Sequence, residues 1–310
     1  MVNKIKIYKN FNIKKSHKRS ILLIGNFDGL HIGHQKLFKL AKIYKNKKKL
    51  KIGVITFDPI PKMYFTKSSK NYRISNFNQK ISFLSNFSVD FVINKKFDKK
   101  FSKTNYFDFI KKILSRKLEA KYIFVSNNFK FGFKRKGNVK LLKSLETKFK
   151  YKVVNPKPLK NKNSVISSTL IRNLLQKGNL ELANKYLNRN WTIEGRVKVG
   201  RKVGRQIGFP TCNIDIKDYV IAKLGVYAIK ASIGDSKKIF KGIANLGYRP
   251  TFDQNKILLE VNLFNFYKNI YYKNLKIEFL KFIRSEKKFK NIEKLKIQIK
   301  KDINETKKIF

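Results

Sequence analysis

The first half of the chain alternates short apolar runs with longer stretches in which apolar residues recur at helical spacing. After the first run, Leu37, Leu40, Ala41 and Tyr44 lie at i, i+3, i+4 and i+7, which predicts one apolar face of a helix. Strands that alternate with helices predict a parallel sheet covered by helices on both faces. The predicted strands cover residues 21–25, 52–57, 91–93 and 122–125.

From Trp191 onward the pattern changes to β-rich runs separated by Gly, Asp and Asn turn signals. The runs at residues 225–233, 239–246 and 257–264 predict a small antiparallel barrel. Apolar residues at helical spacing then predict a closing amphipathic helix over residues 291–309. A length of 310 residues suggests about two domains. The change of pattern places their boundary near residues 187–190.

The large positive net charge of the chain does not by itself indicate a nucleic-acid or membrane partner. Hydrophobic residues make up 42% of the chain, which allows real cores, and the formal net charge is +54. Such a charge is typical of proteins that bind nucleic acids or anionic membranes. However, most of the cations are Lys, and they are spread through every segment together with Asn, Ile, Phe and Tyr, as an A/T-rich genome would produce. We therefore expect weak binding of RNA or DNA at low salt, but no specific nucleic-acid partner.

The cysteine content and the hydropathy of the chain are typical of a cytoplasmic protein. Cys212 is the one cysteine, which excludes an intramolecular disulfide and is typical of a reducing environment. The N-terminal residues contain no apolar run that would serve as the core of a signal peptide. Nowhere do about 18 apolar residues follow one another, as a membrane span requires. We expect a cytoplasmic protein with no membrane partner, and the pattern leaves its oligomeric state open.

A glycine-rich segment with two histidines, G-N-F-D-G-L-H-I-G-H at residues 25–34, lies where the first strand passes into a helix. Backbone N–H groups and the helix dipole attract phosphate at such a junction. His31 and His34 are three residues apart, so they lie on one face of the first helical turn. Two imidazoles there would stabilise the charge that an α-phosphate gains as pyrophosphate leaves. The alternative is a pair of capping or surface residues, whereas a zinc pair lacks a third ligand within spacing.

A hydroxyl cluster, Ser167, Ser168 and Thr169, precedes Arg172 at the head of the helical stretch 169–176. Hydroxyls beside an arginine form a clamp for a polyphosphate. Such clusters also cap helices, which is the alternative here. Because the chain uses Lys almost everywhere else, this Arg indicates a place where a planar two-point donor is needed.

The second half contains a glycine-rich segment and one isolated acid. Four glycines precede P-T-C-N at residues 210–213, which indicates backbone lying against a ligand, or else a set of β-turns. Cys212 within it is interpreted as a small buried residue. Glu260 is an acid within an apolar strand, in a chain with only 19 acidic residues. Either it faces solvent, or it is a base beside a hydroxyl that accepts a phosphoryl group.

Several motifs together resemble those of one bacterial family. The segment from residue 25, T-F-D-P-I-P (56–61), N-F-K-F-G (128–132) and I-S-S-T-L-I-R (166–172) resemble bifunctional riboflavin kinase/FMN adenylyltransferase, also called FAD synthetase, a member of the H-x-G-H nucleotidyltransferases. G-F-P-T-C-N (208–213) resembles the G-F-P-T-A-N signature of riboflavin kinase, and residues 225–228, 245–252 and 283–289 match as well. The resemblance runs collinearly from residue 21 to residue 303. It implies an α/β Rossmann-like nucleotidyltransferase domain (1–187), followed by a small antiparallel β-barrel kinase domain with a C-terminal helix (188–310).

The resemblance also implies a role for each candidate residue. His31 and His34 handle the ATP phosphates, and Glu260 is the base for the ribityl 5′-hydroxyl. Thr211 and Asn213 supply oxygen ligands to Mg²⁺ bound with ATP. For Arg284, contact with flavin or nucleotide competes with a salt bridge to Glu286 or Glu293. The implied ATP- or flavin-binding residues are Gly25, Asn26, Phe27, Asp28, Gly29, Gly33, Asn128, Ser167, Ser168, Thr169, Arg172, Gly195, Gly200, Gly204, Arg205, Gly208 and Arg284.

The expected activity is phosphorylation of riboflavin to FMN, followed by adenylylation of FMN to FAD with release of pyrophosphate. Riboflavin, FMN, FAD and ATP are then the partners, with Mg²⁺ as cofactor. Two departures stand out, because the family commonly has His where Ile60 stands and Gly where Ser126 stands. The rivals are another H-x-G-H enzyme, such as a cytidylyltransferase or a relative of aminoacyl-tRNA synthetases, and an RNA-binding protein on an old nucleotide-binding fold.

Overall fold

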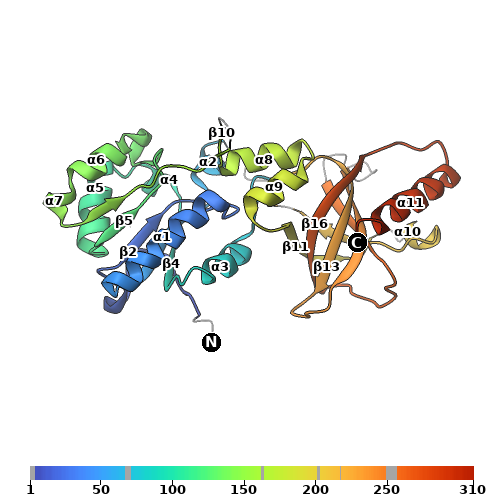
Figure 1. The fold of residues 1–310 in the computed structure, drawn as a ribbon, viewed down its shortest axis with the longest axis horizontal. Helices are drawn as coiled ribbons and strands as arrows, with labels where there is room; N and C mark the ends of the chain where they lie inside the picture. The colour runs from blue at the N-terminus through green and yellow to red at the C-terminus, as the bar shows by residue number, and fades with distance from the viewer. Residues whose placement is uncertain (1–3, 67–70, 162–163, 201–202, 217, 249–256) are drawn as a thin grey trace. The chain divides into compact units, whose positions relative to one another are not determined.

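The computed structural model describes residues 4–66, 71–161, 164–200, 203–216, 218–248 and 257–310. Its contacts divide the chain into two compact units, Met1–Ser69 with Phe77–Ser167, and Lys70–Asn76 with Ser168–Phe310 (Figure 1). The division precedes the predicted boundary at residues 187–188, because the helices that follow Ser167 pack with the second unit. Two sequence motifs lie partly outside the described residues, namely the glycine-rich segment at residues 201–202 and the stretch 245–252 at residues 249–252.

A six-stranded parallel sheet forms the centre of the first unit. Its strands lie in the order β1-β4-β3-β2-β5-β8, and each neighbouring pair is parallel. The four apolar runs predicted as strands all belong to it, which confirms the α/β prediction. The strands are β1 (Lys6–Tyr8), β2 (Ile21–Ile24), β3 (Ile52–Asp58), β4 (Phe91–Lys96), β5 (Tyr122–Phe124) and β8 (Lys152–Val154).

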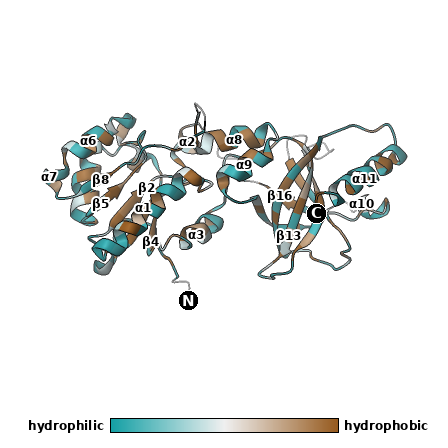
Figure 2. Cartoon of the chain, in the orientation of Figure 1, coloured by the Kyte–Doolittle hydropathy of each residue, from teal (hydrophilic) through white to brown (hydrophobic). Residues whose placement is uncertain are grey.

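Both faces of this sheet are buried. Successive residues of a strand point to opposite faces, so one strand contributes to two core clusters. Ile21 and Leu23 of β2 belong to one core cluster, and Leu22 and Ile24 belong to another. Figure 2 shows the matching concentration of apolar residues on the central strands. The helices of this unit are α1 (Ile32–Lys48), α2 (Pro61–Phe65), α3 (Phe77–Ser85), α4 (Lys99–Ser102), α5 (Tyr106–Asp108), the π-helix η2 (Phe109–Lys117), α6 (Val139–Ser144) and α7 (Glu146–Phe149).

Short elements complete the first unit. Two small antiparallel pairs join β6 (Lys130–Phe131) to β7 (Gly137–Asn138) and β9 (Lys160–Asn161) to β10 (Ser164–Val165). The 3₁₀ turns are η1 (Lys15–His17) and η3 (Phe133–Arg135). Since β2, β3 and β5 are parallel, the loops that follow them all emerge at the carboxyl edge of the sheet. This edge is where ligands of open α/β sheets bind.

A closed antiparallel barrel forms the centre of the second unit, as predicted. Its strands follow one another in the order β11-β12-β15-β14-β13-β16. Along β15 the buried residues Ile257, Leu259, Val261 and Leu263 alternate with more exposed ones, which places Glu260 on the outer face. The strands are β11 (Trp191–Lys198), β12 (Cys212–Asp215), β13 (Gly225–Ile233), β14 (Phe240–Tyr248), β15 (Ile257–Leu263) and β16 (Asn274–Ser285).

Helices flank this barrel. The predicted closing helix is confirmed as α11 (Ile292–Lys307), and the Asn291 side chain caps it by accepting a hydrogen bond from the Lys294 N–H. α11 contacts β13, β14 and β16. The other helices are α8 (Ser168–Gln176), α9 (Leu180–Leu187) and the short α10 (Val203–Gln206).

Candidate active sites

The two histidines of the first unit lie face to face at the start of α1. The imidazole rings of His31 and His34 stack with centroids 3.8 Å apart and planes 24° apart. His31 occupies the N-cap position, but its side chain makes no capping hydrogen bond, so the capping alternative does not describe it. The predicted placement of both rings on one face of the first turn of this helix is therefore confirmed.

The electrostatic setting of His34 favours its neutral form. Burial is the main reason that the pKa of His34 lies well below its ordinary value, and charge on His31 and on the Lys80 ammonium lowers this pKa further. His34 Nδ1 is buried and has no hydrogen-bond partner among the described residues. A phosphate group beside this ring would supply both a partner and a charge that favours protonation.

The glycines of this loop are explained by close approach and by backbone conformation. A Cβ on Gly33 would lie 3.1 Å from ring atoms of His31 and 3.3 Å from the Ile166 carbonyl oxygen. Gly29 has φ +76°, in the left-handed region that glycine tolerates. A Cβ on Gly25 would come within 3.1 Å of the Phe27 ring. Larger residues at these positions would therefore displace the loop that holds His31.

Lys80 of α3 is a site residue that the sequence did not reveal. Its side chain is only 2% exposed, and its Nζ donates to the Asn26 carbonyl oxygen at 2.8 Å and to Thr56 Oγ1 at 3.3 Å. Thr56 Oγ1 in turn donates to the same Asn26 oxygen at 3.3 Å. This network fixes the start of the glycine-rich loop and places a cation behind the histidines. One Lys among so many carried no signal in the sequence.

The neighbouring loops bring further predicted residues to the carboxyl edge of the sheet. Asn128 follows β5 and is exposed, and the Ser126 hydroxyl donates to its Oδ1 at 2.9 Å. The Ser126 hydroxyl thus orients the Asn128 amide. Ile60 follows β3 and is 2% exposed, so this loop places a buried apolar group at the position where the sequence departs from the expected imidazole. Asn26, Phe27 and Asp28 form part of the same edge, and both Phe27 and Asp28 are buried.

The predicted polyphosphate clamp lies at the start of α8. Ser167 belongs to the first unit, whereas Ser168, Thr169 and Arg172 belong to the second. Arg172 Nε donates to the Tyr72 carbonyl oxygen at 2.8 Å, and the guanidinium carbon lies 3.7 Å from the centroid of the Tyr72 ring. These contacts show a stacked, 8% exposed arginine. Its role in holding a triphosphate stays a prediction.

The second unit contains a cavity of about 430 Å³ on the outer face of the barrel. One wall comes from β12, β14 and β15, and the facing wall comes from α11. Three residues predicted for the kinase reaction, Thr211, Asn213 and Glu260, line it together with Gly200, Gly204 and Arg284. Asn213 and Glu260 are directly opposed in the β12/β15 register, so their side chains are neighbours on one face. The structure thus brings these six predicted residues to one cavity.

Two glycines of this cavity leave room for its polar side chains. A Cβ on Gly200 would lie 1.7 Å from Asn213 Nδ2. A Cβ on Gly204 would lie 2.4 Å from the Phe209 carbonyl oxygen and 3.2 Å from Thr211 Oγ1. A side chain at either glycine would therefore collide with its neighbours, among them the Asn213 amide beside Gly200 and the Thr211 hydroxyl beside Gly204. The buried Asn213 Oδ1 has no hydrogen-bond partner within the described ranges, so an unused acceptor fits the predicted metal site.

Three predicted ligand-binding residues are not among those that line the cavity, and their part in binding stays a prediction. Gly195 lies in β11, where a Cβ would come within 2.5 Å of Ile214 Cγ2, so close packing between strands explains it. Arg205 is exposed on α10. Gly208 has φ +90° and open space around it, so a turn explains this glycine.

Arg284 lines the cavity but has a different ion-pair partner from those that the sequence suggested. Its ion pair is with Asp302 of α11, at 2.7 Å between Nη2 and Oδ2, and not with Glu286 or Glu293. Glu286 instead lines the cavity, with its carboxylate against Gly247. Burial is the main reason that the pKa of Glu286 is raised; Arg284 opposes the rise and the negative charge of Glu260 adds to it. Glu286 thus joins Glu260 and Asp302 among the acids that line this cavity, whereas the sequence suggests it only as a salt-bridge partner.

Cys212 is a structural residue, as its position beside functional neighbours predicted. Its side chain is buried and unpaired with any other cysteine. Burial raises the pKa of its thiol to about 12, so the group is a neutral thiol at pH 7.

Two protein-family models match successive parts of the chain. The FAD synthetase family model matches residues 13–170, and the riboflavin kinase family model matches residues 187–310. Among curated relatives, the bifunctional riboflavin kinase/FMN adenylyltransferase of Buchnera aphidicola subsp. Schizaphis graminum is 41% identical over 96% of each chain. The protein of the same name from Haemophilus influenzae is 39% identical over 93% of this chain and 94% of its own. These matches give no support to the rival functions.

A solved structure from Streptococcus pneumoniae, described as a macrolide-efflux protein, shares the fold of the whole chain. The TM-score is 0.84 at 28% sequence identity, and the match covers 98% of this chain and 99% of the other. Within the part of this chain that the structure describes, no helix combines the length and the hydropathy that a bilayer crossing requires.

Proposed function

Because the chain belongs to the bifunctional riboflavin kinase/FMN adenylyltransferase family, we propose that it converts riboflavin to FMN and FMN to FAD, with one ATP consumed in each step. The observation that carries the proposal is the presence of both sites in one chain. A stacked histidine pair opens α1 in one unit, and an opposed Asn213–Glu260 pair lines the cavity of the other. The second site gives a function to residues that a nucleotidyltransferase alone would not need.

In the adenylyltransferase reaction, a phosphate oxygen of FMN forms a bond to the α-phosphorus of ATP, and the bond to pyrophosphate breaks. His31 and His34 would donate hydrogen bonds to the α-phosphate oxygens as negative charge develops there. The backbone N–H groups at the start of α1 add to this attraction. The protein needs no covalent nucleophile, because positioning and charge stabilisation carry such a transfer. Asn128 would hold the flavin phosphate or the nucleotide.

In the kinase reaction, the ribityl 5′-hydroxyl of riboflavin forms a bond to the γ-phosphorus of ATP and ADP leaves. Glu260 would accept the hydroxyl proton. Asn213 and Thr211 would hold Mg²⁺, which neutralises the charge of the ATP phosphates when it is bound. The apolar wall of α11 suits the flat flavin ring, and the polar side of the cavity suits the phosphates. We further propose a cytoplasmic enzyme divided functionally at residues 187–188.

Incubation of the purified protein with riboflavin, ATP and Mg²⁺ should give FMN first and FAD afterwards, with pyrophosphate released as FAD appears. Chromatographic separation of riboflavin, FMN and FAD over time measures both steps. Omission of Mg²⁺ should stop both, since each transfers a group from a polyphosphate. Salt-dependent RNA binding without turnover of either flavin would contradict the proposal and favour the RNA-binding alternative.

The substitution Asn213→Leu should raise the Mg²⁺ concentration for half-maximal FMN formation by about tenfold or more, because it removes the buried oxygen that would bind the metal. The rate is measured against Mg²⁺ at saturating ATP and riboflavin. FAD formation from supplied FMN is the internal control, and its Mg²⁺ dependence should stay as in the parental protein. An unchanged Mg²⁺ dependence of FMN formation would exclude Asn213 as a ligand.

A further inference from the structure

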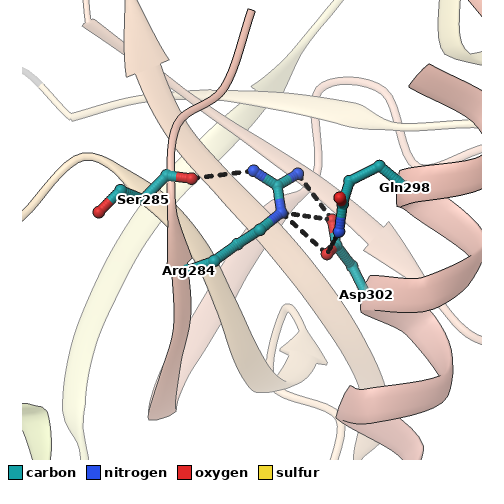
Figure 3. A network of polar contacts seen from close by, with 4 residues as sticks. All are labelled: Arg284, Ser285, Gln298 and Asp302. Carbon is teal, nitrogen blue, oxygen red and sulfur yellow. Dashed lines mark hydrogen bonds and ion pairs between the residues drawn. The ribbon is translucent and has the colours of Figure 1, made fainter. Parts of the chain in front are cut away.

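A buried ion pair joins the C-terminal helix to the barrel (Figure 3), and both of its residues line the kinase cavity. Arg284 lies one residue before the end of β16, and Asp302 lies past the middle of α11. Arg284 Nε donates to both carboxylate oxygens of Asp302, at 2.8 and 3.0 Å, and Nη2 donates to Oδ2 at 2.7 Å. The guanidinium thus meets the carboxylate at two points, in the geometry that makes such pairs strong.

Further hydrogen bonds fix both partners of this pair. Gln298, one turn earlier in α11, donates from Nε2 to Asp302 Oδ1 at 2.8 Å. Arg284 Nη1 donates to the Ser285 carbonyl oxygen at 2.9 Å. The side chains of Arg284 and Asp302 are only 16% and 3% exposed. A pair this buried is costly to break from one side, because the remaining charge would be left without a partner.

The same face of α11 provides the apolar wall of the cavity. Leu295, Ile299 and Ile303 line it at intervals of four residues, and Asp302 lies beside them. The opposite wall carries Asn213 and Glu260. The distance between the walls therefore depends on how α11 is held against the barrel. Arg284 and Asp302, which themselves line the cavity, are the charged link between the two.

We propose that Asp302 is a positioning residue for riboflavin in the kinase reaction, an inference that rests on the proposed function. Its carboxylate holds Arg284 and thereby keeps the apolar face of α11 against the flavin. It also orients the end of β16, from which the chain continues to Glu286. Asp302 does not touch the reacting atoms, so its effect should fall on flavin binding and leave the chemical step nearly unchanged.

The test is Asp302→Asn, which replaces one acceptor oxygen by an amide donor that faces Arg284 and removes the compensating charge. The KM for riboflavin should rise by at least about tenfold, while kcat for FMN formation changes less than about threefold. Amide exchange in residues 292–307 should accelerate, and that in β13, β14 and β15 should not. Asp302→Glu, which retains a carboxylate, should give a KM between those of the parental protein and Asp302→Asn.

Glu305→Gln is the matched control, because it removes the same charge from an exposed position of the same helix. Its riboflavin KM should equal the parental value, and FAD formation from FMN should be parental in all variants. The proposal is overturned if Asp302→Asn keeps the parental KM, if the control raises KM equally, or if both Asp302 variants lose FAD formation in parallel. Riboflavin affinity is also measured by quenching of flavin fluorescence. A parental protein that binds riboflavin without phosphorylating it would refute the proposed function. The ratio of the riboflavin affinities of Asp302→Asn and the parental protein would still decide the role of Asp302.

Discussion

The substitution His31→Ala is expected to reduce FAD formation at least about 10²-fold, to the limit of detection in an ordinary assay, while FMN formation continues at the parental rate. The His31 ring stacks on His34 at 3.8 Å, so its loss removes one donor and also the surface that orients the other. The two reactions are measured separately, FAD formation with supplied FMN and FMN formation with supplied riboflavin.

His17→Gln is the control for this prediction, since His17 is the remaining histidine of the chain. It is buried beside β1 and β4, where its Nδ1 lies 2.8 Å from the Tyr8 hydroxyl and its ring stacks on Phe91. Glutamine can keep the hydrogen bond, and FAD formation should remain close to parental. If His31→Ala makes FAD at the parental rate, the assignment of the adenylyltransferase site is wrong.

The substitution Glu260→Gln is expected to lower kcat for riboflavin phosphorylation by at least about 10²-fold, because the amide cannot accept the proton of the ribityl hydroxyl. The side chain keeps its size, so the cavity and the neighbouring Asn213 should be little disturbed. FAD formation from FMN should be unaffected. FMN production from riboflavin at saturating ATP is the measurement.

Glu278→Gln is the matched control for Glu260, since it removes an acid from another barrel strand outside the cavity. Glu278 pairs with Lys276 at 3.3 Å, and the loss of this partly exposed pair should cost little. A decrease of less than threefold for Glu260→Gln would remove Glu260 from the catalytic role and direct attention to Glu286.

The fold was predictable because its elements carry strong periodic signals. The four residues of β2 are all apolar and at most 2% exposed, and β15 alternates buried and partly exposed positions along its whole length. Asn291 marks the start of α11 by its capping preference. Elements of this kind are specified by local sequence, so a single chain is enough to find them.

The parts that escaped prediction depend on contacts between residues distant in sequence. The sequence suggests for Arg284 only partners close to it in the chain, whereas the helix brings Asp302 back to it from eighteen positions away. Lys80 is distinguished only by its burial and its bond to Asn26, because Lys is the commonest residue type of the chain. The contacts of Arg172 with Tyr72 likewise follow from tertiary packing.

The segment 71–76 has a consequence for how the kinase half could be isolated. Although both of its neighbouring segments belong to the first unit, it packs with the second. Trp191 Nε1 donates to the Ile74 carbonyl oxygen at 3.1 Å, Asn76 Nδ2 donates to the Tyr219 hydroxyl at 2.8 Å, and the Arg73 N–H donates to the Asp218 carbonyl oxygen at 2.8 Å. A fragment excised at residue 188 would leave the indole and the phenol without these partners. The two units are thus interleaved along the chain. A gene fission at residue 188 would separate the second unit from residues 71–76, and new contacts would have to replace those of this segment.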